Sequence, residues 1–423
     1  MIKRDFYLNQ IIRHMHNGEI KVITGIRRCG KSVLLFDLFR EYLIQNGISE
    51  DQIIAIELDQ RKNHKYRNPI TLCEYVESIV TANKEKQFYL FIDEVQFTAK
   101  VKDADSDIEV TIYDMLNELK AYKNLDVYVT GSNSKMLSSD IATEFRGRAT
   151  QIRIYPFSFE EFYSHVGGDE RKALEQYMLY GGMPRVLQMS EEQDKKEYLS
   201  NLYRELYIKD IVERNGIERE DILNNILDFL ASQIGSLTNP TNVANAIASM
   251  RQEKVNSALV SSYIAHTIDA FLLRMAQRYD IKGKSYFNYP NKYYYTDIGL
   301  RNARLNYRQY DPGHIMENII YNELIRRGYS VDVGVVVDRR NSGYVQKEID
   351  FVINQGDKKF YIQSALQMDT EQKQAAELDS LKLTGDFFKK IVVRMDIPHN
   401  FYDDNGIYHC NLIDFLLERV DVF

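Results

Sequence analysis

The segment GIRRCGKS, residues 25–32, combines two glycines with a lysine and a serine at the spacing of a phosphate-binding loop. Glycines allow the backbone to curl until its N–H groups face a phosphate. Lys31 would bring its charge to the β- and γ-phosphates of ATP, and the Ser32 hydroxyl would hold Mg²⁺. The spacing therefore predicts a nucleotide site made by Gly25, Ile26, Arg27, Arg28, Cys29, Gly30, Lys31, Ser32 and Val33.

A pair of acids follows the apolar run QFYLFI, residues 87–92. Adjacent acids at the end of a strand are usually solvated charges. One strand away from a phosphate loop they become catalytic candidates, with Asp93 in the Mg²⁺ shell and Glu94 polarising the attacking water.

Small polar residues end a third apolar run, VYVTGSNSKML, residues 127–137. Asn133, with Ser132 as the lesser candidate, would hydrogen-bond the γ-phosphate or the lytic water. The alternative is a simple turn without a catalytic role.

These three motifs need a scaffold that brings them to one edge. Short β-branched or aromatic runs alternate with helical patterns over the first 155 residues: KVIT, QIIAIEL, QFYLFI, DVYVTG and QIRIY. This alternation predicts an α/β fold with a parallel sheet covered by helices. The helix after the loop would direct its positive end at the bound phosphate.

Five motifs in order, GIRRCGKS, LFIDEVQ, VTGSNSKML, FRGRATQIRIYPFSFEEF and YGGMPRVL, resemble the prokaryotic AAA-type ATPases, close to their STAND-like branch. The resemblance implies the strand order 5-1-4-3-2, a helical lid, and a catalytic glutamate beside the metal aspartate. It also implies that Pro184 packs against adenine and that Arg148 senses phosphate charge. From residue type alone, Arg148 would more often be a surface ion pair.

The middle of the chain has the pattern of a winged helix, in which two helices, NPTNVANAIASM and NSALVSSYIAHTIDAFLL, precede a β-hairpin. Residues 271–310 hold eight Lys or Arg, two Asp and eight Tyr. Such a stretch could follow a DNA backbone through Lys282, Lys284 and Lys292 and stack bases on tyrosine. The alternative, slightly favoured by the net charge of −7, is a packing platform with buried tyrosines.

The C-terminal third resembles a restriction-endonuclease-like (PD-(D/E)XK-type) domain, with Glu317 on a helix and Asp350 on a strand. The next strand has Gln363 and Ala365 where a nuclease needs an acid and a lysine for its cation and its nucleophile. We therefore expect a nuclease-like fold that does not cleave, unless Lys347 or Lys373 replaces the missing lysine.

The length of 423 residues favours several domains. We expect an ATPase core at 1–160, a lid at 161–215, a winged helix at 216–300 and a nuclease-like domain at 301–423. Three scattered cysteines and a first segment without an apolar signal core favour the cytoplasm, with no membrane partner. The expected function is an ATP-hydrolysing switch. The alternatives are a nucleotide-gated DNA-binding regulator and an ATP-dependent nuclease, while a protein partner or self-association stays open.

Overall fold

The computed structural model describes residues 2–102, 108–131, 148–338 and 345–420. It divides the chain into two compact units, Met1–Tyr155 with Asp269–Phe271 and Pro156–Ile268 with Leu272–Phe423. The finer division into four domains stays a prediction.

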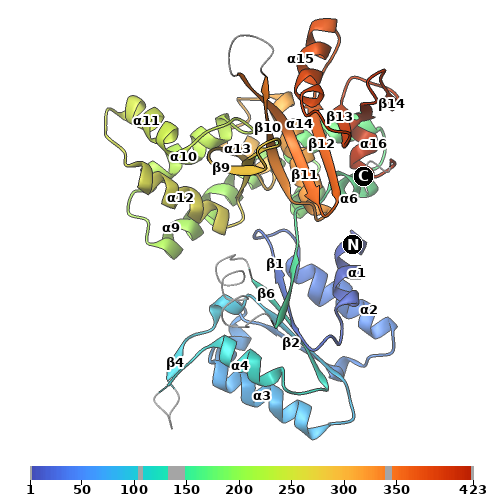
Figure 1. The fold of residues 1–423 in the computed structure, drawn as a ribbon. Helices are drawn as coiled ribbons and strands as arrows, with labels where there is room; N and C mark the ends of the chain where they lie inside the picture. The colour runs from blue at the N-terminus through green and yellow to red at the C-terminus, as the bar shows by residue number, and fades with distance from the viewer. Residues whose placement is uncertain (1, 103–107, 132–147, 339–344, 421–423) are drawn as a thin grey trace. The chain divides into compact units, whose positions relative to one another are not determined.

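A five-stranded parallel sheet forms the centre of the first unit (Figure 1), in the order β2-β3-β6-β1-β7. Numbered along the chain within this sheet alone, the order is 5-1-4-3-2, as the resemblance implied. The fold-class prediction is therefore confirmed. The strands are β1 (Ile20–Thr24), β2 (Ile53–Glu57), β3 (Phe88–Asp93), β6 (Leu125–Gly131) and β7 (Ala149–Arg153).

Helices cover both faces of this sheet (Figure 1). On one face, Leu90 and Ile92 belong to the core formed with α3 (Pro69–Ala82) and α4 (Ile112–Leu119). On the other face, Phe39 packs its ring 5.6 Å from that of Phe91. Phe39 ends the π-helical turn η1 (Val33–Phe39), which continues into α2 (Arg40–Gln45) and lies beside α1 (Asp5–Arg13).

The alternation of side chains along a strand then decides where the polar strand ends point. Phe91 faces η1, so Asp93, two residues later on β3, is on the same face. Tyr128 also packs against Phe39, which places Thr130 of β6 on this face. Since η1 follows the glycine-rich loop directly, both polar side chains are directed toward the loop.

An eight-stranded mixed sheet forms the centre of the second unit, in the order β14-β15-β13-β12-β11-β10-β8-β9. Helices α14 (Pro312–Arg326), α15 (Glu371–Lys382) and α16 (Leu412–Leu416) pack on it. The strands are β8 (Leu273–Asp280), β9 (Ser285–Tyr295), β10 (Val331–Asp338), β11 (Val345–Gln355), β12 (Lys358–Ala365), β13 (Lys389–Arg394), β14 (Phe401–Tyr402) and β15 (Tyr408–Asn411).

The remaining helices of the second unit precede this sheet or connect to it. They are α6 (Phe159–Val166), α7 (Glu170–Tyr180), α8 (Glu192–Asn201), α9 (Lys209–Asn215), α10 (Glu220–Ser232), α11 (Pro240–Arg251), α12 (Ser257–Asp269) and α13 (Ile298–Arg304). Among the described residues, no helix combines the length and the apolar character needed to cross a bilayer.

The order of helices and hairpin expected for a winged helix is present as α11, α12, β8 and β9. The hairpin does not stand alone, however, because β8 also pairs in parallel with β10 and so extends the C-terminal sheet. The winged helix therefore stays a prediction. The hairpin physically belongs to the same sheet as the nuclease-like segment.

Candidate functional site

The glycine-rich loop joins β1 to η1 and needs its first glycine. Gly25 has φ +151°, and a Cβ atom placed there would lie 2.3 Å from the carbonyl oxygen of Ile154. Gly30 has φ +98°. Any larger residue at Gly25 would force the loop away from the strand end.

Two buried cations hold the backbone of this loop. The Lys31 side chain donates to the carbonyl oxygens of Gly25 and Ile26, at 3.1 and 3.2 Å. Arg4, before α1, donates to the carbonyl oxygens of Cys29 and Tyr155, each at 2.8 Å. Lys31 thus lies inside the loop curve, whereas sequence reasoning missed Arg4 because it is far from the motif.

A carboxylate with two hydroxyl partners lies beside the loop. Asp93 accepts a hydrogen bond from Ser32 Oγ at 2.7 Å and another from Thr130 Oγ1. Burial raises the pKa of Asp93, and the hydrogen bonds from Thr130 and Ser32 partly offset that rise. Ser32 and Asp93 therefore lie side by side, and their role as metal ligands stays a prediction. Thr130 was missed, although its position at the end of an apolar run was a usable signal.

Glu94 follows in the left-handed region, with φ 56° and ψ 55°. Its N–H donates to Thr130 Oγ1 at 3.1 Å, and its carboxylate accepts a hydrogen bond from the Gln96 amide. Left-handed backbone is uncommon for a residue with a side chain and is often found at functional sites. Thr130 therefore contacts both acidic residues. Its hydroxyl proton is donated to the Asp93 carboxylate, and its oxygen accepts the backbone N–H of Glu94.

The remaining predicted residues are less well placed. Ile26 and Cys29 are buried, Arg27 is half-buried, and Arg28 and Val33 are exposed. Arg148 is exposed just before β7, where its carbonyl oxygen accepts the N–H of Ile20. Asn133, like Ser132, lies outside the described residues. The roles of all these residues stay predictions.

Pro184 lies in the second unit, at the start of the turn η6 (Pro184–Gln188). Gly182, two residues before it, has a structural reason of its own. The N–H of Gly182 donates to the buried Asp297 at 2.7 Å, and a Cβ atom on Gly182 would lie 2.1 Å from the carbonyl oxygen of Phe157. Burial raises the pKa of Asp297 to about 6. The assignment of Pro184 to adenine stays a prediction.

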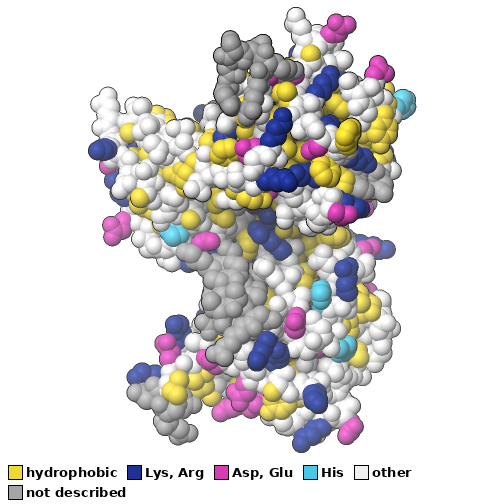
Figure 2. Space-filling model, viewed as in Figure 1, with side chains coloured by type: hydrophobic (Ala, Val, Ile, Leu, Met, Phe, Trp, Pro, Cys, Tyr) yellow, Lys and Arg dark blue, Asp and Glu magenta, His cyan; other side chains and the backbone are white. Residues whose placement is uncertain are grey.

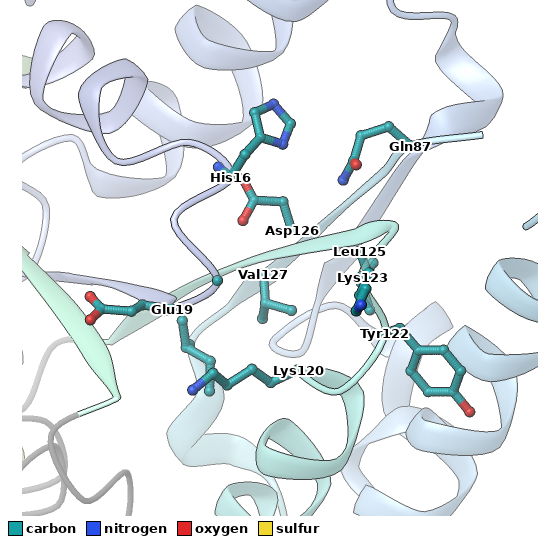
Figure 3. Close-up of a pocket in the computed structure, with 11 residues that line it drawn as sticks. His16, Glu19, Gln87, Lys120, Tyr122, Lys123, Leu125, Asp126 and Val127 are labelled. Atoms are coloured by element: carbon teal, nitrogen blue, oxygen red, sulfur yellow. Dashed lines mark hydrogen bonds between the residues drawn. The ribbon is translucent and has the colours of Figure 1, made fainter. Parts of the chain in front are cut away.

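A separate hollow of about 300 Å³ lies at the amino ends of β1 and β6 (Figure 3). There Asp126 accepts from the N–H of His16 at 3.0 Å and from the Tyr128 hydroxyl at 2.7 Å, and it pairs with the buried Lys21. Burial lowers the pKa of Lys21 despite this partner. The hollow is at the opposite end of the strands from Asp93 and contains none of the predicted site residues.

Comparison with known proteins agrees with this geometry. Residues 17–163 match the family model described as an AAA domain. A Haemophilus influenzae protein named "Uncharacterized protein" is 33% identical over 99% of this chain and 99% of its own length. The chain belongs to the family of that protein. Its N-terminal unit is an AAA-type P-loop domain.

Other matches extend over the remainder of this AAA-domain protein. Residues 171–311 and 312–408 match two domains of unknown function, DUF8612 and DUF4143. "Uncharacterized protein MJ1544" of Methanocaldococcus jannaschii is 28% identical, covering 84% of this chain and 77% of its own. The structure of the Aeropyrum pernix ORC1 protein in complex with DNA is 10% identical, with a TM-score of 0.27, over 72% of this chain and 92% of that one. That score is too low to bear on function.

A second group of charges lies in the C-terminal half of this AAA-domain protein. Glu317 on α14 and Asp350 on β11 are both buried, and their assignment to a degenerate nuclease-like site stays a prediction. Between them lies the ammonium group of Lys292 from β9, which is 2.8 Å from Glu317 Oε1 and 3.3 Å from Asp350 Oδ1. Glu348 approaches the same nitrogen to 2.6 Å.

Lys347 and Lys373, the two lysines that could replace the missing one, have other partners in the structure. Lys347 pairs with Asp379, and Lys373 is exposed and pairs with Asp369. Lys292 had been considered for DNA backbone contact, but its side chain is 2% exposed. The prediction of a DNA contact is therefore wrong for Lys292, because its ammonium group is buried and already paired with carboxylates.

The electrostatics of the cluster follow from burial and charge. Burial alone would lower the pKa of Lys292, but Glu317, Asp350 and Glu348 together raise it above its usual value. Burial, with a contribution from Asp350, raises the pKa of Glu317 to about 7. Lys292 is therefore a permanent cation in this cluster.

The basic, tyrosine-rich stretch divides into two parts in the structure. Tyr293, Tyr294 and Tyr295 are buried. Lys282 and Lys284 at the hairpin turn are exposed, as are Tyr286 and Tyr289 of β9. On the face drawn in Figure 2, basic side chains are scattered among acidic ones. The exposed end of the hairpin therefore has lysines and tyrosines available for nucleic-acid contact.

Proposed function

We propose that this protein binds and hydrolyses ATP and acts as a nucleotide-controlled switch. The observation that carries the proposal is the hydrogen-bonded set of Ser32, Asp93 and Thr130 beside a loop whose curvature encloses Lys31. The AAA domain match over residues 17–163 supports nucleotide binding independently.

Lys31 is the proposed ligand of the terminal phosphates. Its ammonium group now donates to two carbonyl oxygens of its own loop, so an incoming phosphate can replace neutral acceptors with a charged one. Hydrogen bonds to charged acceptors are shorter and stronger than those to neutral acceptors. The exchange therefore favours the bound state.

Ser32 and Asp93 supply the oxygen atoms that Mg²⁺ prefers, and their contact of 2.7 Å supports the proposal that they share one small cation. Mg²⁺ would neutralise charge on the phosphates when bound. Thr130 holds the carboxylate of Asp93 in place from its other oxygen.

Glu94 is the proposed residue that orients the attacking water. Its backbone is held by Thr130 and its carboxylate by Gln96, so both ends of the residue are positioned. A carboxylate with a fixed orientation can accept a proton from water in a defined direction.

The test of hydrolysis is Glu94→Gln, which keeps the size and removes the charge. We expect ATP affinity to stay within about 3-fold of the parent, while turnover falls by about 10²- to 10⁴-fold, the usual contribution of general base catalysis. Binding is measured by calorimetry and turnover by phosphate release, each with and without DNA. Equal turnover in variant and parent would assign the role to another residue.

The output of the switch is the binding behaviour of the C-terminal half. One alternative is a nucleotide-gated DNA-binding protein, which the exposed Lys282, Lys284 and Tyr289 favour. The other alternative, an ATP-dependent nuclease, is disfavoured by Gln363, which donates to Glu377 at 3.0 Å and is no acid. Ala365 offers no ammonium group.

A further inference from the structure

The carboxylate cluster of the C-terminal half is built around a side chain rather than around an open position. Lys292 Nζ lies within 3.3 Å of oxygen atoms from Glu317, Glu348 and Asp350. An ammonium group has three N–H donors, and here three carboxylates surround it. The number of donors therefore matches the number of acceptors.

The residues at this cluster do not fit a divalent cation. Ligand oxygens bind Mg²⁺ or Ca²⁺ at about 2.0–2.6 Å, so an ion shared by Glu317 and Asp350 would lie against the ammonium group. Two like charges at such a separation repel strongly in a buried setting. The point where the carboxylates converge is already taken by Lys292.

The two buried carboxylates have further hydrogen-bond donors, one of them on the same Glu317 oxygen that contacts Lys292. Glu317 Oε1 also accepts from the Tyr294 hydroxyl at 2.6 Å, and Asp350 Oδ2 accepts from the N–H of Ser364 at 2.9 Å. Gln363 accepts from the N–H of Asp350 through its amide oxygen, at 3.3 Å. The hydrogen bonds from Tyr294 and Ser364 therefore use carboxylate oxygens that a metal ion would need.

We propose that the ammonium group of Lys292 takes the place of a metal ion. The cluster is then a metal-free network of ion pairs that joins β9 to α14 and β11. In the sheet, β9 is separated from β11 by β8 and β10. The long side chain of Lys292 therefore connects strands that share no hydrogen bonds. It fastens the β8–β9 hairpin to the nuclease-like part of the sheet.

The cluster also lines a hollow of about 760 Å³, together with Gly235, Ser236 and His314. Water and ions can enter such a space, so removal of the ammonium group would expose three carboxylates to solvent cations. The inference thus predicts a hidden cation site that the natural lysine keeps closed.

The direct test is Mn²⁺ binding by calorimetry and electron paramagnetic resonance on the full chain without nucleotide. All variants carry Asp93→Asn, so that an ion held at the phosphate loop is not counted. We expect the Asp93→Asn protein, which is the parent in this test, and its Asp350→Asn derivative to show the same weak Mn²⁺ binding. Lys292→Ala should bind Mn²⁺ at least about 10-fold more tightly, because the carboxylates lose their internal cation.

Two controls complete the design. Lys282→Ala removes an exposed lysine of the same hairpin and should leave Mn²⁺ binding unchanged. Lys292→Ala combined with Asp350→Asn should lose the gained site. If Lys292→Ala does not fold, the pair of Lys292→Met and Glu317→Gln removes one charge of each sign and keeps a similar volume. Hydrogen exchange of β9 in that double variant should then be faster than in the parent.

Two results would overturn the proposal. The first is Mn²⁺ binding by the parent that Asp350→Asn abolishes, since the lysine would then leave room for an ion. The second is a folded Lys292→Ala protein that gains no Mn²⁺ binding. Slow exchange of β9 in the double variant, equal to that of the parent, would likewise exclude the fastening role.

Discussion

The phosphate-loop site and the C-terminal cluster use the same residue types in opposite ways. Each places a buried lysine near at least one buried carboxylate. In the first, Lys31 donates to backbone carbonyl oxygens of its own loop, and Asp93 is held by two hydroxyl groups. In the second, Lys292 is bonded directly to the carboxylates.

This difference explains why one site can receive charged ligands and the other cannot. A carboxylate held by neutral hydroxyls keeps its negative charge for a cation, and a lysine held by carbonyls keeps its positive charge for a phosphate. When a lysine and a carboxylate pair with each other, each neutralises the charge of the other. Neither charge is then available to a ligand. Residue composition alone therefore does not distinguish a binding site from a structural ion pair.

The largest effect is expected for Lys31→Ala. The variant should lose ATP affinity by at least about 100-fold, or about 2.8 kcal/mol, because the charged donor to the phosphates is gone. Without nucleotide it should unfold at nearly the same denaturant concentration as the parent. Calorimetry measures the first property, and Lys292→Ala, if folded, should bind ATP normally. Undiminished affinity in Lys31→Ala would remove the basis of the nucleotide-site assignment.

The opposite pattern is expected for Lys292→Ala. Its free energy of unfolding should fall by about 3–5 kcal/mol, because the buried Glu317 and Asp350 and the partly exposed Glu348 lose their partner. Urea denaturation followed by circular dichroism measures this change, with Lys282→Ala as the exposed control. A loss below about 1 kcal/mol would mean that the ion pairs do little to hold the second unit together.

A pH dependence should appear in the cluster. The pKa of Glu317 is raised from 4.5 to about 7, so the folded protein retains a proton that the unfolded chain releases. Stability from this group is therefore complete below pH 4.5 and is lost as the pH rises to about 7. As the pH rises from 4.5 to about 7, the free energy of unfolding of the parent should fall more than that of Glu317→Gln. Parallel curves for parent and variant in denaturation at pH 5 and pH 7.5 would contradict the shift.

The smallest effect concerns the exposed end of the hairpin. If it contacts DNA, replacing Lys282 and Lys284 by Glu should reduce the slope of log affinity against log salt by about 1.8, since two phosphate contacts are lost. Fluorescence anisotropy at several salt concentrations measures the slope. Lys373→Glu, an exposed lysine away from the hairpin, is the control. No binding by the parent at low salt would favour a purely structural hairpin.

Much of the first unit could be predicted because its signals are local. The loop GIRRCGKS, the run ending in Asp93 and the alternation of strands with helices each depend on neighbouring residues, and parallel strands must meet at one edge. The predicted neighbourhood of Lys31, Ser32 and Asp93 appears in the structure. The roles of Asn133, Arg148 and Pro184 could not be placed in the same way, because they depend on contacts between distant segments.

The amino-acid sequence alone was sufficient for the parallel α/β sheet and the glycine-rich loop, while the strand order came from the resemblance to AAA-type ATPases. It could not show that Lys292 fills the cluster. That lysine is 25 residues from Glu317 and 58 from Asp350, and nothing in its neighbours distinguishes it from Lys282 or Lys284. Only the folded chain buries one lysine among carboxylates and leaves the others in water, because burial depends on strands and helices that are distant in sequence.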